Sequence, residues 1–190
     1  MVDLPLFPLL TVVMPGGRLP LRIFEPRYLA MVRDCFKNQS GFGICIAKDD
    51  VAPSTAEPYS CGTLIEITDW DQDENGLLLI VTEGVQKFRI ISTRVTQDDL
   101  LTGEVELLPL EKKTPVPANL VHLAELLKRA LHQVGPLVNY TEGDFEDAVW
   151  VSGRLVELMP MSARLRQDLC ELDDPVERLI ALEKFIGTEQ

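Results

Sequence analysis

The residues that could carry acid-base or nucleophilic chemistry do not occur at spacings that favour it. His122 and His132 lie on the polar side of one predicted helix, and neither has the i, i+4 partner that a shared metal ion would need. Ser92, Ser152 and Ser162 lack the sequence context of a nucleophile elbow, and no motif places a histidine to activate them. We therefore predict no catalytic residue in this chain.

An acidic cluster is the next candidate for chemistry. Asp69, Asp71, Asp73 and Glu74 follow one another closely, and carboxylates at such spacing can hold Ca²⁺. The segment lacks the glycine and terminal glutamate spacing of an EF-hand loop, however. Asn75-Gly76 comes directly afterwards and is a strong signal for a tight hairpin turn. We interpret the cluster as a solvated hairpin tip and predict neither a metal nor a cofactor.

Four residues around Pro26 are candidates for binding a polypeptide. Glu25 and Arg27 would present a charged pair, and Phe24 and Tyr28 would add apolar contact. A structural role is the alternative. A carboxylate at a helix N-terminus gains roughly 0.3–1 kcal/mol from the helix dipole, and aromatic residues at this spacing commonly anchor a helix to a sheet.

Trp150 is a further candidate in the second half of the chain. Together with Val151 and Leu158, it falls outside the main apolar stripe of its predicted helix. Such residues either pack against neighbouring helices or form an exposed apolar patch that binds partners. We include Trp150 among the residues predicted to contact a polypeptide.

Composition narrows the classes of function. The chain has 190 residues, of which 46% are hydrophobic and 25% charged, as is typical of globular proteins. Its net charge of −12 repels phosphate backbones and anionic lipid headgroups, so nucleic-acid binding and membrane association are disfavoured. No stretch approaches the roughly 18 apolar residues of a membrane helix. The cysteines show no C-x-x-C pairing and no secretion signal is recognisable, so we expect a cytoplasmic protein with free thiols.

Local patterns predict the elements that position these residues. Pro26 presets a helical φ and pushes Glu25 to extended geometry, so a short amphipathic helix is expected over 26–38. Apolar alternation broken by Gly, Pro, Asn and Asp indicates strands at 19–24, 41–47, 63–68, 77–81, 85–92 and 103–107. The run 77–81 is continuously apolar and is typical of a strand buried on both faces.

Two further segments complete the first half. Residues 4–9 are interpreted as an edge strand, either open to an added peptide strand or protected by its prolines, and a surface loop is expected over 49–60. The short connections predict a mostly antiparallel, closed or nearly closed sheet, with the helix over one end.

The second half is predicted to be helical. After the polar, proline-containing connector 111–117, the apolar period changes from two to about 3.6, and the stripes indicate three or four helices. Such stripes can be buried only against one another or against the sheet. We predict an α+β protein with a β domain over 1–112 and a helical domain over 113–190.

Four segments, in the same order, resemble the N-terminal domain of Lon proteases. They are Leu-Pro-Leu-Phe-Pro-Leu at 4–9, Leu-Pro-Leu-Arg-Ile-Phe-Glu-Pro-Arg-Tyr at 19–28, Cys-Gly-Thr-Leu-Ile-Glu-Ile at 61–67, and Asn75-Gly76 followed by Glu83-Gly84 and Lys-Phe-Arg-Ile at 87–90. Many members of that family have His at the position of Arg22 and Arg at that of Lys87. The resemblance implies a PUA-like pseudo-β-barrel with one helix, followed by a small helical bundle.

The resemblance also implies a function. Lon N-terminal domains recognise polypeptides, especially damaged or unfolded ones, and partner proteins. The sequence contains no G-x-x-x-x-G-K-[ST] phosphate loop, so we expect a stand-alone, non-catalytic binding module without ATPase or peptidase activity. Delivery of the bound chain to a separate protease would be one use of such binding. The alternative is RNA binding, which other PUA-like barrels perform, through Arg22, Arg27, Arg89 and Arg94.

Overall fold

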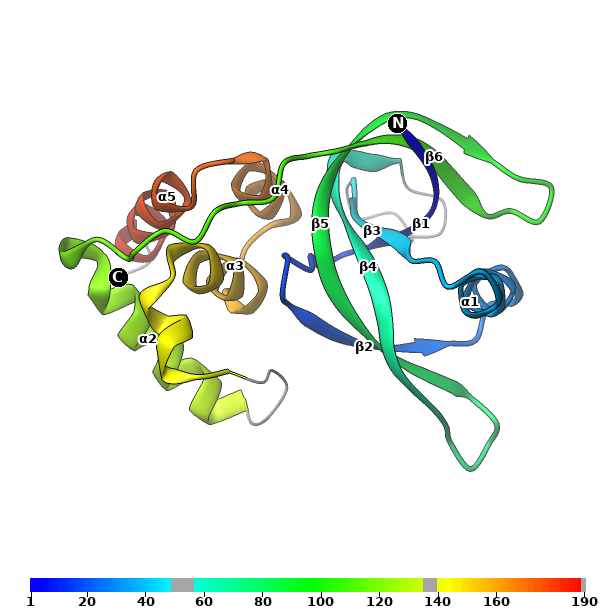
Figure 1. Ribbon diagram of the computed structural model, residues 1–190, viewed down its shortest axis with the longest axis horizontal. Helices are drawn as coiled ribbons and strands as arrows, with labels where there is room; N and C mark the ends of the chain where they lie inside the picture. Colours follow the sequence, from blue (N-terminus) through cyan, green and yellow to red (C-terminus); the bar gives the residue numbers. More distant parts are fainter. Residues whose placement is uncertain (49–56, 135–139, 189–190) are drawn as a thin grey trace. The chain divides into compact units, whose positions relative to one another are not determined.

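The computed structural model describes residues 1–48, 57–134 and 140–188 (Figure 1). The chain forms two compact units, Met1–Pro109 and Leu110–Gln190, which we call the barrel unit and the helical unit. The division into a β domain over 1–112 and a helical domain over 113–190 stays a prediction. Most of the loop predicted over 49–60 lies outside the described residues, but Pro58, Tyr59 and Ser60 already belong to a strand.

The barrel unit contains a six-stranded sheet in the order β2-β5-β4-β3-β1-β6, and an additional pairing of β5 with β6 closes it. Only β1 and β3 run parallel among these pairings, so the sheet is mostly antiparallel, as predicted. The elements are β1 (Val2–Leu9), β2 (Arg18–Ile23), α1 (Pro26–Asn38), β3 (Phe42–Ala47), β4 (Pro58–Gln72), β5 (Leu78–Val95) and β6 (Leu101–Leu107).

The interpretation of residues 4–9 as an edge strand is wrong. β1 lies between two neighbours: Val2 to Pro5 pair with β6, and Leu6 to Leu9 pair with β3. The strand at the end of the sheet order is β2, which pairs with β5 alone in the described part of the chain. Local sequence could not reveal this, because pairing is decided by distant partners.

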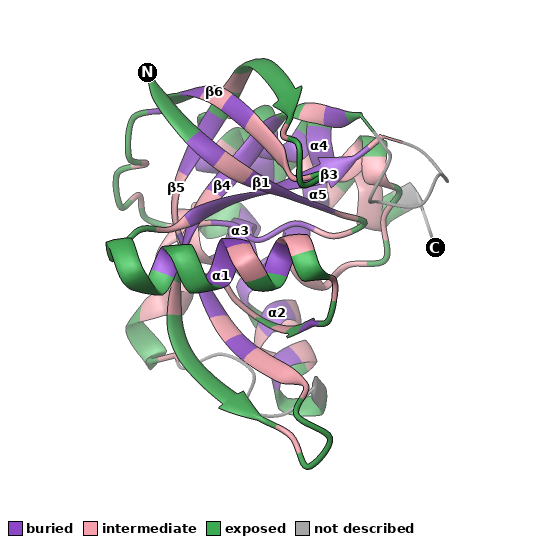
Figure 2. Ribbon diagram, turned by 90° about the vertical axis from the view of Figure 1, so that its right-hand side faces the viewer, coloured by how far each residue is buried: buried purple, intermediate pink, exposed green. Residues whose placement is uncertain are grey.

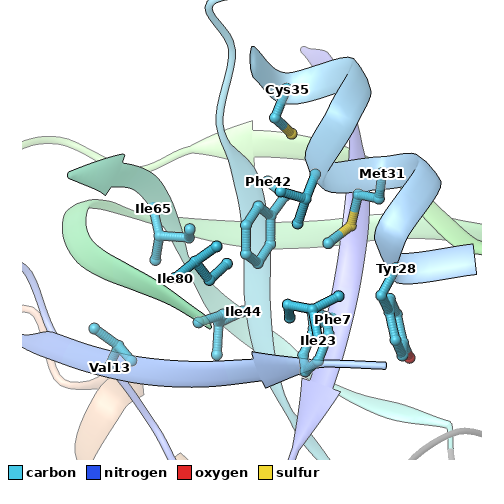
Figure 3. Packing of buried hydrophobic residues seen from close by; sticks show 11 residues of the cluster. Phe7, Val13, Ile23, Tyr28, Met31, Cys35, Phe42, Ile44, Ile65 and Ile80 are labelled. Atoms are coloured by element: carbon cyan, nitrogen blue, oxygen red, sulfur yellow. The ribbon is translucent and has the colours of Figure 1, made fainter. Parts of the chain in front are cut away.

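The helix α1 covers one side of the barrel core, as its sequence predicted. Glu25 has extended geometry, Pro26 occupies the first turn, and Gln39 ends the helix in the left-handed conformation. Figure 3 shows Tyr28, Met31 and Cys35 on the side of α1 that faces Phe42 and the strands. These side chains join one buried cluster, whose further members include Phe7, Val13, Ile23, Val32, Ile44, Ile65 and Ile80.

The strands β4 and β5 continue beyond the core as a long hairpin, which projects from the barrel in Figure 1. The turn is tight, as predicted: Gly76 adopts a φ of 80° and its N–H donates to Asp73 O at 2.9 Å. Burial of the run 77–81 on both faces is wrong, because only Ile80 is fully buried. Figure 2 shows the outer part of β4 as exposed. A projecting hairpin has one face turned away from the core.

The helical unit consists of two 3-10 turns and four α-helices in its described residues. They are η1 (Ala118–Leu120), α2 (Val121–Val134), η2 (Glu142–Glu146), α3 (Ala148–Leu158), α4 (Ala163–Glu171) and α5 (Pro175–Thr188). Side-chain caps begin three of these helices. Asp147 Oδ1 accepts from Val149 N at 3.0 Å, Ser162 Oγ accepts from Leu165 N at 3.2 Å, and Asp174 Oδ1 accepts from Val176 N at 2.7 Å. No described helix of either unit is both long enough and apolar enough to cross a membrane.

The helix α3 is buried on nearly all sides. Val151 is fully buried, and Trp150 and Leu158 are half-buried, although all three were predicted to lie outside the main stripe. Arg154 is buried in the same helix and pairs with Glu157, with Nε 2.6 Å from Oε2. A single-stripe pattern does not describe this helix, because it has neighbours on several sides.

Candidate functional site

The outer face of β2, β5 and β4 carries a group of aligned side chains. Leu21 and Ile23 of β2 and Leu78 and Ile80 of β5 pack on the core cluster, so the residues that alternate with them face away from the core. Strand pairing arranges those residues in two rows across the sheet. One row is Pro20, Val81 and Asp69, and the other is Arg22, Leu79 and Asp71.

These six side chains line a groove. Together with atoms of Leu21, Trp70 and Ile80, they border an open cavity of about 510 Å³. Its floor is apolar, because Leu79 and Val81 of the central strand lie between Pro20 on β2 and the carboxylates of β4. A volume of this size is sufficient for two or three side chains of a bound molecule. We call this feature the arm groove.

The charges of the arm groove stand on opposite borders. Asp69 Oδ1 accepts from Trp70 N at 2.9 Å, and Asp71 Oδ1 accepts from Gln72 N at 2.8 Å. Within the described ranges, neither carboxylate pairs with a cation and Arg22 pairs with no carboxylate. Arg22 and Asp71 both stand opposite Leu79, so they are two strand spacings apart, roughly 10 Å.

An aromatic pair that joins α1 to the β4–β5 hairpin lies beside the arm groove. The rings of Phe36 on α1 and Trp70 on β4 are 6.2 Å apart in an edge-on arrangement, with exposed fractions of 44% and 61%. A smaller cavity of about 300 Å³ adjoins Phe36 and is lined also by Cys35, Gln39, Ser40, Glu66 and Ile67. Exposed aromatic side chains of this kind are common anchors in protein interfaces.

The four residues predicted around Pro26 occupy two kinds of position. Phe24 directly follows β2 and is 70% exposed. Tyr28 is buried, its ring centroid lies 4.1 Å from that of Phe7, and burial raises the pKa of its hydroxyl. Only Phe24 presents most of its surface to solvent.

Arg27 and Glu25 are engaged with each other. Arg27 Nε and Nη2 donate to Glu25 Oε2 at 3.0 and 2.6 Å, and Arg27 Nη1 donates to Asp99 O at 2.9 Å. The guanidinium also lies 4.7 Å from the ring centroid of Tyr28. Glu25 does not cap the helix with its side chain. These contacts fasten the start of α1 to the turn between β5 and β6, and binding of a polypeptide by the pair stays a prediction.

Trp150 belongs to an aromatic cluster of the helical unit. Its ring centroid is 5.1 Å from that of Phe145 and 6.2 Å from that of Tyr140. Lys128 Nζ lies 5.5 Å from the centroid of Phe145. Trp150 is half-buried by these neighbours, and its contact with a polypeptide also stays a prediction.

The arginines proposed for RNA binding have acidic neighbours. Arg94 forms an ion pair with Asp3, and Arg27 forms one with Glu25. Arg22 shares the arm groove with two aspartates, and Arg89 stands opposite Glu106 of β6. In the described part of the chain, moreover, no group of three His, Cys, Asp or Glu side chains is placed to hold a metal ion.

Sequence reasoning missed Trp70, Leu79 and Val81 as site residues. The acidic composition around Trp70 led to its interpretation as part of a hairpin tip, whereas β4 continues to Gln72. One signal was available: the order Asp69-Trp70-Asp71 alternates as a strand with one wet face does. No comparable signal shows that Leu79 and Val81 face outward.

Comparisons with known proteins agree with this architecture. Residues 3–187 match the family described as ATP-dependent protease La (LON) substrate-binding domain. A crystal structure of a Lon N-terminal domain protein from Xanthomonas campestris is 34% identical and superposes with a TM-score of 0.79, covering 98% of both chains.

Curated relatives are longer proteins. Protein cereblon of Gallus gallus is 27% identical over 66% of this chain and 28% of its own length. Lon protease 2 of Desulfotalea psychrophila is 23% identical over 97% of this chain and 25% of its own length. The chain thus spans about a quarter of the length of these relatives. The match over residues 3–187 shows that the chain belongs to the LON substrate-binding domain family.

Proposed function

We propose that this chain binds segments of other polypeptides, holds them in the arm groove, and makes or breaks no covalent bond in them. The observation that carries the proposal is the groove itself, an open cavity of about 510 Å³ with an apolar floor and charged borders. Membership of a family described by substrate binding supports it. Apolar contact at the floor would supply affinity, because each buried Leu or Val side chain contributes about 1.5–3 kcal/mol.

Binding to the face of the sheet is favoured over addition of a strand to its edge. The edge strand β2 carries Pro20, which lacks an N–H and is a common guard against strand addition. Phe24 follows β2 two residues beyond Arg22, and we propose that it extends the apolar contact. Contacts from Glu25, Arg27 and Tyr28 of the barrel unit are part of the same proposal, in a supporting role. Trp150 of the helical unit is proposed as a separate polypeptide contact.

The test is a titration with a fluorescein-labelled, reduced and carboxymethylated protein as the unfolded ligand, read by fluorescence anisotropy. Leu79→Asp places a charge on the groove floor and should weaken binding about tenfold or more. Ile91→Asp is the matched control, since Ile91 lies on the same strand, is 51% exposed and does not line the groove. It should change the affinity less than about twofold.

Two results would contradict the proposal. If the wild-type protein does not bind the unfolded ligand, polypeptide binding fails; if Leu79→Asp and Ile91→Asp behave alike, the arm groove is not the site. Incubation of the same ligand with the protein, ATP and Mg²⁺ should leave the ligand uncut and the ATP intact.

The RNA-binding alternative is tested in the same format. A titration with single-stranded RNA at two salt concentrations should show weak binding, because the net charge is −12 and two of the four proposed arginines are paired. Tight binding with a steep negative salt dependence would instead favour RNA as the ligand.

A further inference from the structure

We propose that the arm groove selects segments that carry one basic and one acidic residue, in either order, with two apolar residues between them. This inference rests on the proposed function, since it names the class of polypeptide segment that the same groove would hold. It concerns side chains of the barrel unit alone, namely Arg22, Asp69, Asp71, Leu79 and Val81.

The two rows of side chains place opposite charges on opposite borders of the arm groove. Arg22 borders the groove on β2, and Asp69 and Asp71 border it on β4, with the apolar side chains of β5 between them. A segment that crosses the strands therefore meets negative charge, then apolar surface, then positive charge. Complementarity requires a basic residue beside the aspartates and an acidic residue beside Arg22, and the bound segment can run in either direction.

The charged side chains of the arm groove are not neutralised within the folded protein. In the described residues, Arg22 and the two aspartates have no ion-pair partner. Leu79 separates Arg22 from Asp71 by two strand spacings, roughly 10 Å, which is too far for a direct bond. A ligand can thus pair with both borders without breaking a contact that the protein already makes. By contrast, Arg18 on the same strand is already paired with Glu83 at 2.9 Å.

The width of the groove fixes the spacing of the charges. Unfolded chains frequently adopt the polyproline II conformation, in which residues i and i+3 lie on the same side, about 9 Å apart. That separation matches the distance of roughly 10 Å between the two borders. The residues at i+1 and i+2 then cross above Leu79 and Val81 with their side chains turned about 120° to either side, so the contact with the floor comes from the atoms near their backbone. The proposed class accordingly has Lys or Arg at i and Asp or Glu at i+3, or the reverse, with apolar residues at i+1 and i+2.

Competition against the labelled unfolded ligand tests the inference. The competitors are peptides capped at both ends that contain Lys-Leu-Val-Glu, Lys-Leu-Val-Lys or Glu-Leu-Val-Glu in a Gly-Ser background. The Lys-Leu-Val-Glu peptide should compete about fivefold better than either like-charged peptide at low salt, because it gains one exposed ion pair and avoids one repulsion. High salt should shrink this difference, since exposed charges are screened.

A charge reversal sharpens the test. Arg22→Glu makes both borders acidic, so the Lys-Leu-Val-Lys peptide should become the best competitor and Lys-Leu-Val-Glu should lose its lead. Arg33→Glu is the control, because it changes the net charge equally on an exposed residue of α1 that does not line the groove. It should leave the ranking of the peptides unchanged.

The outcomes separate the inference from the proposed function. If the unfolded ligand binds but the peptides compete equally or not at all, the need for opposite charges is overturned and polypeptide binding stands. A ranking that survives Arg22→Glu also overturns the inference. If the unfolded ligand itself does not bind, the proposed function fails, and the inference with it.

Discussion

The barrel unit and the helical unit fill their interiors with different side chains. The barrel cluster around α1 is apolar, with Phe42, Ile44, Ile65 and Ile80 almost completely buried. In the helical unit, the largest fully buried side chains are those of Arg154 and Arg178. A closed sheet satisfies most of its backbone by strand pairing, and the barrel buries only Thr63, Thr82 and Lys87 as polar side chains among its described residues. Four short helices leave many terminal carbonyls to be satisfied by side chains.

Arg178 supplies hydrogen-bond donors to such carbonyls in the helical unit. Its guanidinium nitrogens donate to Glu111 Oε1 and Oε2 at 2.5 and 3.0 Å, to Ser152 Oγ at 3.0 Å, and to the carbonyls of Leu169 and Leu172 at 3.2 and 2.7 Å. One side chain thereby joins the connector, α3, the end of α4 and α5. Apolar packing therefore dominates the interior of the barrel unit, whereas buried arginines with several polar bonds help to hold the helical unit together.

Loss of Arg178 should give the largest loss of stability among these tests of the two units. Arg178→Ala removes the guanidinium that pairs with the buried carboxylate of Glu111, and breaking such a pair costs about 3–5 kcal/mol. Urea unfolding would measure it, with Trp150 as the reporter of the helical unit in a Trp70→Phe background. Arg164→Ala is the control: its exposed ion pair with Asp168 on α4 should contribute at most about 0.5 kcal/mol. Similar losses for both variants would contradict the special role of the buried pair.

Glycine-to-alanine substitutions should change the stability of the two units in opposite directions. A Cβ on Gly43 of β3 would lie 2.6 Å from Phe88 Cζ and 2.8 Å from Leu6 Cδ2, so Gly43→Ala should destabilise the barrel by about 1–3 kcal/mol. Gly187 lies in the last turn of α5 and has nothing within 4 Å of an added Cβ, so Gly187→Ala should stabilise its helix by at most about 0.5 kcal/mol.

The reporter for the barrel would be Trp70, in a Trp150→Phe background. Phe88→Leu should relieve part of the crowding, so the double variant with Gly43→Ala should lose less stability than the sum of the two single variants. Additive losses would show that crowding against Phe88 is not the cause.

A helix cap should give a smaller change. Ser162→Ala removes the side chain that accepts from Leu165 N and should lower the stability of the helical unit by about 1 kcal/mol. Ser162→Gly should cost only a few tenths of that amount, about 0.3 kcal/mol. Equal losses in urea unfolding would indicate that the cap does not matter.

Cys45 in the barrel should give the smallest effect, visible only at high pH. Burial in the apolar core raises the pKa of its thiol from 9.0 to about 12. Between these values the unfolded chain loses the proton first, so stability should be unaffected below pH 9 and should decline above it. Thiol labelling at pH 8 should reach Cys45 only after unfolding, and fast labelling of the native protein would contradict its burial. Cys45→Ala, which lacks a titrating group, is the control for the decline.

Several features of the fold were predictable because they depend on neighbouring residues. Pro26 fixed the start of α1, Asn75-Gly76 the hairpin turn, and Ser162 and Asp174 the starts of two helices, all as the structure has them. The site was less predictable. Phe24 is exposed as a contact residue should be, but the groove side chains at 20, 22, 69, 71, 79 and 81 become neighbours only through strand register.

The sequence alone therefore fixes where turns form and helices begin in this protein, its family resemblance and its acidic charge. These features depend on residue type and on interactions within a few positions. Tertiary structure decided which strand lies inside the barrel, which face of β5 is open, and which arginine is buried. Arg178 and Glu111 are 67 positions apart, and β1 finds its partners β3 and β6 far along the chain. Such contacts are selected by the packing of the whole unit, and no short window of sequence contains both partners.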